Sequence, residues 1–96
     1  MTTVVLAQAG ELDLATIHHL IDRLAAHRQP GRRVVLDLRG VTFMDCYALG
    51  QIIKLHAHSA VEGWTLHLRV ETPIVLRLFD LTGAASFLSL EQPAIA

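Results

Sequence analysis

The chain has 96 residues, the length of one modest domain with a single hydrophobic core. Apolar residues make up 52% of the sequence and charged residues 18%, which excludes the composition of a disordered chain. The net charge is −1 and the eight Lys and Arg are scattered, so the basic stripe needed for nucleic-acid binding is missing.

Membrane insertion and secretion are not expected either. No apolar run reaches the roughly 18 to 20 residues that span a bilayer, and the first residues lack the pattern of a signal peptide. The single cysteine, Cys46, has no partner for an internal disulfide. We therefore expect one domain over residues 1–96 in the reducing environment of the cytoplasm.

The first half of the chain predicts a strand, a helix and a second strand. Residues 4–9 are apolar and β-branched and precede a glycine turn, which predicts a strand. Asp13 is a natural N-cap, and apolar residues recur with helical spacing over 14–28, until Pro30 ends the helix. Residues 33–38 are a nearly continuous apolar run, typical of a central strand.

The second half predicts a helix over about 46–60, a strand over 65–70, and a helix that begins at Thr72-Pro73 and ends at Gly83. Residues 86–90 predict a short last strand. The helix over 46–60 has an apolar side that includes Ala60. It also has a stripe that faces solvent or a partner, made of Tyr47, Gln51, Lys54 and His58.

This order of elements predicts an α/β fold with short connections, which favour parallel strands and right-handed crossovers. Because Leu66, Leu68 and Val70 all fall on one face of their strand, we expect the helices to gather on one side of the sheet. The prediction is a small mixed or mostly parallel sheet of about four strands, with three helices packed mainly on one face.

Six histidines invite a metal hypothesis. His18 and His19 are adjacent, and His56 and His58 are two residues apart, so neither pair shares one face of a helix as a ligand pair would. We predict no metal site, surface histidines, and a half-buried His56.

Catalytic chemistry also finds little support. Cys46 stands near a helix start without a visible base beside it, so we expect it to be a small buried residue. Asp37 and Asp45 are candidates for a carboxylate pair, but capping is favoured, of the helix by Asp45 and of the preceding loop by Asp37. No glycine-rich phosphate cradle is present. We predict neither a cofactor nor an enzyme.

Three segments carry a family resemblance. Gly10-Glu-Leu-Asp13, Val34-Val-Leu-Asp-Leu-Arg-Gly-Val-Thr-Phe-Met-Asp45 and Leu81-Thr-Gly83 fall in the order of the STAS domain, and nearly the whole chain resembles an anti-sigma factor antagonist. The resemblance implies a small sheet with helices on one side. Known members often start with one more strand, which this chain is expected to lack.

The resemblance also implies a regulatory site. In the family, the aspartate precedes Ser-Ser-Gly or Ser-Thr-Gly, and a partner that is both serine kinase and anti-sigma factor phosphorylates the second hydroxyl. Asp45 matches the aspartate, Cys46 the first hydroxyl position, Tyr47 the phosphorylated position and Ala48 the glycine. A tyrosine hydroxyl lies several ångströms farther from its backbone than a serine hydroxyl, so we expect the usual switch to be absent.

Tyr47 has two interpretations, an anchor at a protein interface or a tyrosine lying on the domain's own surface. The predicted function is binding to an anti-sigma factor or a related signalling ATPase. The alternative is a structural or scaffolding STAS subunit of a transport or stress complex, with self-association. A small-molecule sensor, and Thr42 or Ser59 as substitute phosphosites, stay open.

Overall fold

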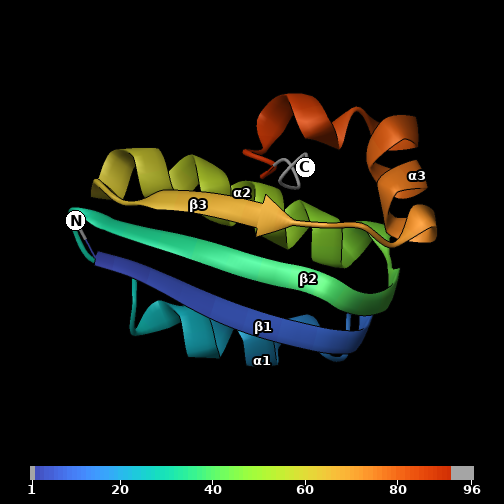
Figure 1. Cartoon of the computed structure of the whole chain (residues 1–96), viewed down its shortest axis with the longest axis horizontal. Helices are drawn as coiled ribbons and strands as arrows, with labels where there is room; N and C mark the ends of the chain where they lie inside the picture. Colours follow the sequence, from blue (N-terminus) through green and yellow to red (C-terminus); the bar gives the residue numbers. More distant parts are fainter. Residues whose placement is uncertain (1, 92–96) are drawn as a thin grey trace, which may run out of the picture.

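Three parallel strands form the sheet of this α/β domain, in the order β1-β2-β3 (Figure 1). The computed structural model describes residues 2–91. The strands and helices are β1 (Thr2–Leu12), α1 (Ile17–Ala25), β2 (Arg32–Met44), α2 (Cys46–Glu62), β3 (Thr65–Arg69), α3 (Pro73–Thr82) and the 3₁₀ helix η1 (Ala84–Phe87).

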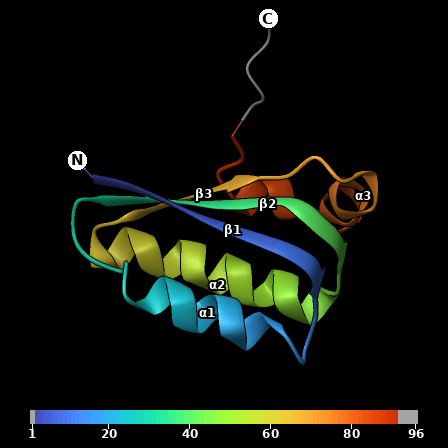
Figure 2. The same ribbon diagram turned by 60° about the horizontal axis from the view of Figure 1, so that its bottom comes forward.

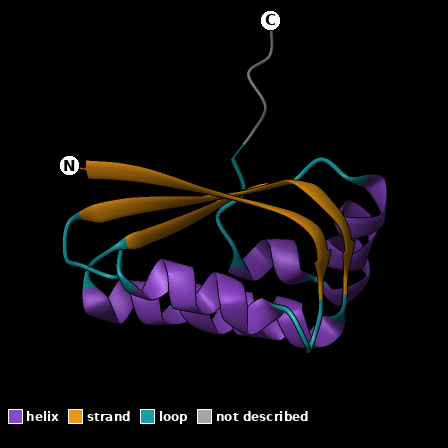
Figure 3. Ribbon diagram, turned by 90° about the horizontal axis from the view of Figure 1, so that it is seen from below, coloured by secondary structure: helices purple, strands orange, loops and turns teal. Residues whose placement is uncertain are grey.

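The helices are placed as the parallel connections require. Both α1 and α2 cover the same face of the sheet, as Figure 2 shows from one side and Figure 3 from below. The third helix, α3, lies at the C-terminal end of the strands and contacts β2. The predicted α/β class, with helices mainly on one face, is confirmed, although the described sheet has three strands instead of about four.

The core lies between the sheet and the helices. From β2, Leu36 and Leu38 point toward the helices and are fully buried. They meet Leu24 of α1 and Ile52 of α2, which have no exposed surface either. Each such side chain contributes about 1.5 to 3 kcal/mol by leaving water, so this layer is the main source of stability.

β2 continues well beyond the predicted residues 33–38. A strand of this length is possible because β1 follows it to Leu12, with register shifts after Ala7 and after Gly10. At Gly40, an added Cβ would lie 3.1 Å from the Cβ of Ala9, so the two backbones approach closely there. Gly10, which was expected to end the first strand in a turn, lies inside β1, next to the second of these register shifts.

The first helix is shorter than predicted at its start. Asp13 does not cap α1, because its Oδ1 accepts hydrogen bonds from the backbone N–H groups of Ala15 at 2.9 Å and Thr16 at 3.0 Å. These bonds close a tight turn, and the helix begins only at Ile17. The predicted helix over 14–28 is therefore limited to residues 17–25.

The predicted starts and ends of α2 and α3 are confirmed. Gly63 and Gly83 end the two helices in the left-handed conformation, with φ of 82° and 72°. Thr72 stands at the N-cap of α3, but its hydroxyl donates to the carbonyl of Val41 at 2.7 Å. Thr72 thus fastens α3 to β2.

The predicted strand over 86–90 is wrong. After Gly83 the chain turns directly into η1, and Phe87, at the end of η1, is 62% exposed. Of the described residues that follow, Leu90 forms one isolated parallel bridge with Leu68 of β3. Within the described residues, the segment makes a single ladder contact where a full strand was expected, because residues 84–87 form η1 instead of pairing with β3.

Two glycines provide a test of these packing constraints. We expect Gly40→Val to lower the free energy of unfolding by about 1 to 3 kcal/mol, because its side chain must displace Ala9. Gly50→Ala in the interior of α2, where an added Cβ meets nothing within 4 Å, should raise it by about 0.5 to 1 kcal/mol. Urea unfolding measures both, and a neutral Gly40→Val would contradict the close approach.

Candidate functional site

Asp45 holds together two loops at the C-terminal end of the sheet. As predicted, it is the N-cap of α2, and its Oδ1 accepts a hydrogen bond from the backbone N–H of Ala48 at 2.8 Å. Its Oδ2 accepts a second bond from the N–H of Leu14 at 3.0 Å. The backbone N–H of Asp45 also donates to the carbonyl of Leu12 at 3.1 Å. One residue thereby joins the β1–α1 loop to the start of α2.

Asp37 and Asp45 do not form a carboxylate pair. Asp37 lies within β2 and accepts hydrogen bonds from the guanidinium of Arg39 at 2.9 and 2.8 Å, and from the Arg39 N–H at 3.2 Å. The hydrogen bonds from the Arg39 side chain are the main cause that lowers the pKa of Asp37 to about 2. The carboxylates thus have separate partners, and no loop is present for Asp37 to cap.

The residues after Asp45 differ in exposure because the turn of the helix directs them to different sides. Cys46 is exposed, which corrects the expectation of a small buried residue. Tyr47 is 49% exposed, whereas Ala48 has no exposed surface and belongs to the core. Positions 46 and 47 are therefore open to a partner, while positions 45 and 48 are fixed by the structure.

A comparison with known protein families shows which family this chain belongs to. A family model described as "Mlab, STAS domain" matches residues 2–90. The chain belongs to the STAS domain family. A curated relative, the anti-sigma-B factor antagonist of Bacillus subtilis, is 27% identical over 82 residues, covering 85% of this chain and 75% of the relative. The resemblance inferred from the sequence is confirmed.

In this STAS domain, Leu14 extends the exposed surface at the start of α2. Its side chain is 64% exposed, and its backbone N–H is held by Asp45. We call Leu14, Cys46 and Tyr47 the α2 N-terminal surface. Its apolar and aromatic groups, set beside a capped helix end, suit a protein contact. Sequence reasoning missed Leu14, because its bond to Asp45 spans 31 residues and no local pattern reports it.

The predicted stripe along α2 exists as a surface feature. Lys54 and His58 are exposed with Tyr47, and Gln51 is half-buried. The buried side of the helix differs from the prediction. Ala60, which was expected on the apolar side, is exposed, and the buried positions include Leu55 and Ser59. The exposure of these side chains is observed for the stripe, and their role in binding stays a prediction.

The two substitute phosphosites are not equivalent. Thr42 is exposed on β2. Ser59 is only 4% exposed, and its hydroxyl donates to the carbonyl of His56 at 2.6 Å. A kinase needs a free hydroxyl in an accessible segment, so the folded domain withholds Ser59 from this chemistry.

The histidines do not converge on a common centre. Over residues 2–91, no three His, Cys, Asp or Glu side chains come together in a way that could hold a metal ion. His56 is half-buried as predicted, and its Nε2 lies 2.9 Å from the hydroxyl oxygen of Ser89. Within the same described range, no helix is long and apolar enough to cross a membrane.

Substitutions of Asp45 separate its two bonds. We expect Asp45→Asn to keep the helix cap but lose the acceptor for Leu14, which lowers the free energy of unfolding by about 0.5 to 1.5 kcal/mol. Asp45→Ala loses both bonds and should cost about 0.5 to 2 kcal/mol more. Urea unfolding of the two variants measures the difference, and equal stabilities would show that only one of the bonds matters.

Proposed function

We propose that this STAS domain is a regulatory binding protein that docks on an anti-sigma factor or a related signalling ATPase through the α2 N-terminal surface. The observation that carries the proposal is the exposure of Tyr47 on a helix start fixed by Asp45. An ordered, half-exposed tyrosine offers a large apolar area and loses little conformational freedom on binding, which makes it a favoured interface anchor.

The family and the relative support the class of partner. The relative from Bacillus subtilis is named for antagonising an anti-sigma-B factor, and the match includes 85% of this chain. A partner of this class acts in the cytoplasm, and we propose the same compartment for this protein. The stripe that continues from Tyr47 through Gln51, Lys54 and His58 adds polar groups for the rim of such a contact.

We further propose that the contact is not switched by serine phosphorylation. A serine kinase positions a hydroxyl close to its own backbone against the γ-phosphate of the nucleotide, and the hydroxyl of Tyr47 lies beyond a whole ring. Phosphate adds nearly two negative charges, which would oppose docking of an apolar surface. Without that modification, the domain stays in its binding form, and regulation must come from the partner or from protein levels.

A second candidate is a scaffolding STAS subunit that stays assembled in a larger complex. This candidate is favoured by apolar side chains exposed on α3 and η1, which are separate elements from those that form the α2 N-terminal surface. Leu81 is 73% exposed, Phe87 62% and Ile74 55%. Association through this second area would be independent of Tyr47, so light scattering on the wild type and on a Tyr47→Ala variant distinguishes the two functions.

Calorimetric titration with the cell's own ATPase-type anti-sigma factors tests the first candidate. We expect Tyr47→Ala to weaken binding at least about tenfold, because the loss of an anchor ring costs 1.4 kcal/mol or more. Tyr47→Phe keeps the ring and should bind nearly as the wild type does. Val61→Ala is the matched control, because Val61 is 88% exposed at the far end of the same helix. If no anti-sigma factor binds, or if Tyr47→Ala binds normally, the proposal fails.

Restoring the hydroxyls tests the missing switch. We expect the double variant Cys46→Ser, Tyr47→Ser to gain one phosphate when it is incubated with the partner kinase, ATP and Mg²⁺. The wild type should stay unmodified, because it offers no serine at this helix start. Intact-mass spectrometry reads out both results. Phosphorylation of wild-type Tyr47 by the same kinase would contradict the absence of the switch.

A further inference from the structure

The face of the sheet opposite α1 and α2 carries an arginine pair that the proposed function does not use. No helix of the described residues covers this face (Figure 3). The register places Arg33 of β2 opposite Thr65 of β3, and Arg69 of β3 opposite Asp37 of β2. Between these two rows lies the row of Val35 and His67. The two arginines therefore start from adjacent strands, on either side of a shared central row.

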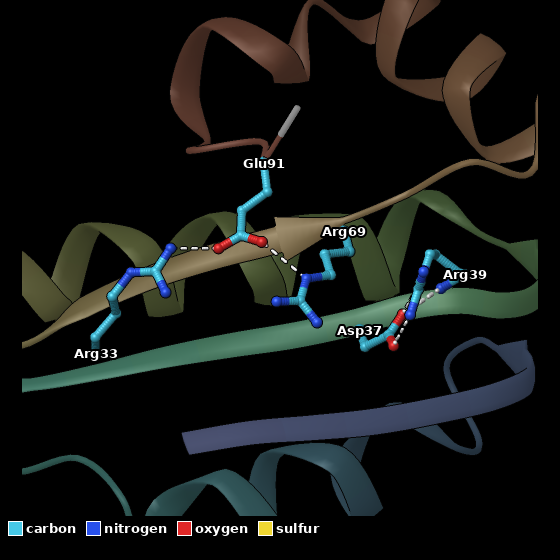
Figure 4. A network of polar contacts seen from close by, with 5 residues as sticks. All are labelled: Arg33, Asp37, Arg39, Arg69 and Glu91. Atoms are coloured by element: carbon cyan, nitrogen blue, oxygen red, sulfur yellow. Dashed lines mark hydrogen bonds and ion pairs between the residues drawn. The ribbon is translucent and has the colours of Figure 1, made fainter. Parts of the chain in front are cut away.

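Both guanidinium groups reach toward the centre of this face and bracket one carboxylate, that of Glu91 (Figure 4). Oε2 of Glu91 accepts a hydrogen bond from Nε of Arg69 at 2.8 Å, and Oε1 accepts one from Nη2 of Arg33. The side chain of Glu91 is 19% exposed, and those of Arg33 and Arg69 are 32% and 35% exposed. Each oxygen thus has its own arginine, in a partly sheltered position.

The electrostatics of the site favour an anion. The hydrogen bond from Arg69, and then that from Arg33, lower the pKa of Glu91, so the carboxylate is charged at neutral pH. Asp37 is the nearest acidic alternative in the register, but its oxygens already accept from Arg39. If Glu91 left, Arg33 and Arg69 would both lose the carboxylate that accepts their hydrogen bonds, and Asp37, which also attracts Arg69, would stay bonded to Arg39.

The segment that carries Glu91 is held by a small set of contacts. The hydroxyl oxygen of Ser89 lies 2.9 Å from Nε2 of His56, and Leu90 packs against the core. Leu90 forms an isolated bridge, and two backbone hydrogen bonds attach the segment to Leu68, from the Leu68 N–H to Ser89 at 2.9 Å and from the Glu91 N–H to Leu68 at 2.8 Å. By contrast, Arg33 belongs to the central strand, which is paired on both sides. Because it has one ladder contact, the segment that carries Glu91 opens locally at a lower cost than the paired strands of the sheet do.

We propose that Arg33 and Arg69 form an anion-binding site for the carboxylate or phosphate group of a small ligand, and that Glu91 occupies this site as an internal stand-in. Two guanidinium groups, each with several N–H donors, match the oxygens of either group. The ligand replaces Glu91 and releases Ser89 and Leu90 from the outer edge of β3. This site lies apart from the α2 N-terminal surface, so it goes beyond the proposed function.

Glu91 sets the affinity of the site by competition. A ligand binds only to molecules in which Glu91 has left, so the apparent affinity falls in proportion to that fraction. Replacing Glu91 by a neutral residue of the same shape removes the competitor. The variant Glu91→Gln should therefore bind the anion more tightly than the wild type, and both arginines should be required for that binding.

Titration at low ionic strength, followed by NMR of the arginine Nε–Hε groups, tests the proposal with inorganic phosphate and acetate as probes. We expect Glu91→Gln to bind at least one probe about tenfold more tightly than the wild type. A gain with acetate assigns a carboxylate ligand, and a gain with phosphate alone assigns a phosphate ligand. Adding Arg33→Gln or Arg69→Gln should abolish the gain, whereas Arg77→Gln, which removes an exposed cation on α3, should leave it unchanged.

Amide hydrogen exchange of Leu68 gives a second readout that does not depend on the affinity of a probe. Its N–H donates to Ser89, so release of the segment exposes it. We expect at least tenfold faster exchange in Glu91→Gln than in the wild type, with the central amides of β2 unchanged. The proposal is overturned if Glu91→Gln binds neither probe more tightly than the wild type, or if Arg77→Gln weakens binding as much as the substitutions of Arg33 and Arg69 do.

Discussion

The structure of this STAS domain depends on one carboxylate at the C-terminal end of the sheet. Asp45 accepts hydrogen bonds from the first turn of α2 and from the β1–α1 loop, while its own N–H is bound to the end of β1. Without it, the helix start and the loop would both expose unpaired backbone donors. The surface proposed for binding is built on these same two segments. Asp45 therefore stabilises the fold and also fixes the backbone that carries the exposed side chains around it.

The two faces of the sheet follow different physical rules. The face that α1 and α2 cover is stabilised by burial of apolar side chains, which does not indicate any particular partner. The other face is held by charges, with Arg39 on Asp37 and two arginines on Glu91. Exposed ion pairs of this kind contribute only about 0 to 1 kcal/mol each, so they are poor fasteners and exchangeable contacts. Most of the stability therefore comes from the packed face, and the open face is where we propose that a ligand binds.

Much of the architecture could be predicted because the signals were local. The apolar period placed the second helix, and the proline and glycines placed the third within a few residues. The errors arose where distant contacts decide. Asp13 closes a turn instead of capping α1, Gly40 passes close to Ala9 inside a strand, and Phe87 belongs to a 3₁₀ helix. At the candidate site, the cap and the exposed tyrosine were predictable, but the bond to Leu14 and the arginines around Glu91 were not, because both join residues far apart in the chain.

The burial of Ala48 beside the exposure of Cys46 and Tyr47 has a consequence for how such a motif evolves. Asp45 and Ala48 are constrained by folding, because Asp45 caps the helix and Ala48 fills the core. Cys46 and Tyr47 project into solvent, so folding places little constraint on them. Substitutions at Cys46 and Tyr47 should therefore cost little stability, so these two side chains can change while the fold is kept. Asp45 is thus required by the fold, whereas the fold leaves the side chains at positions 46 and 47 free to differ.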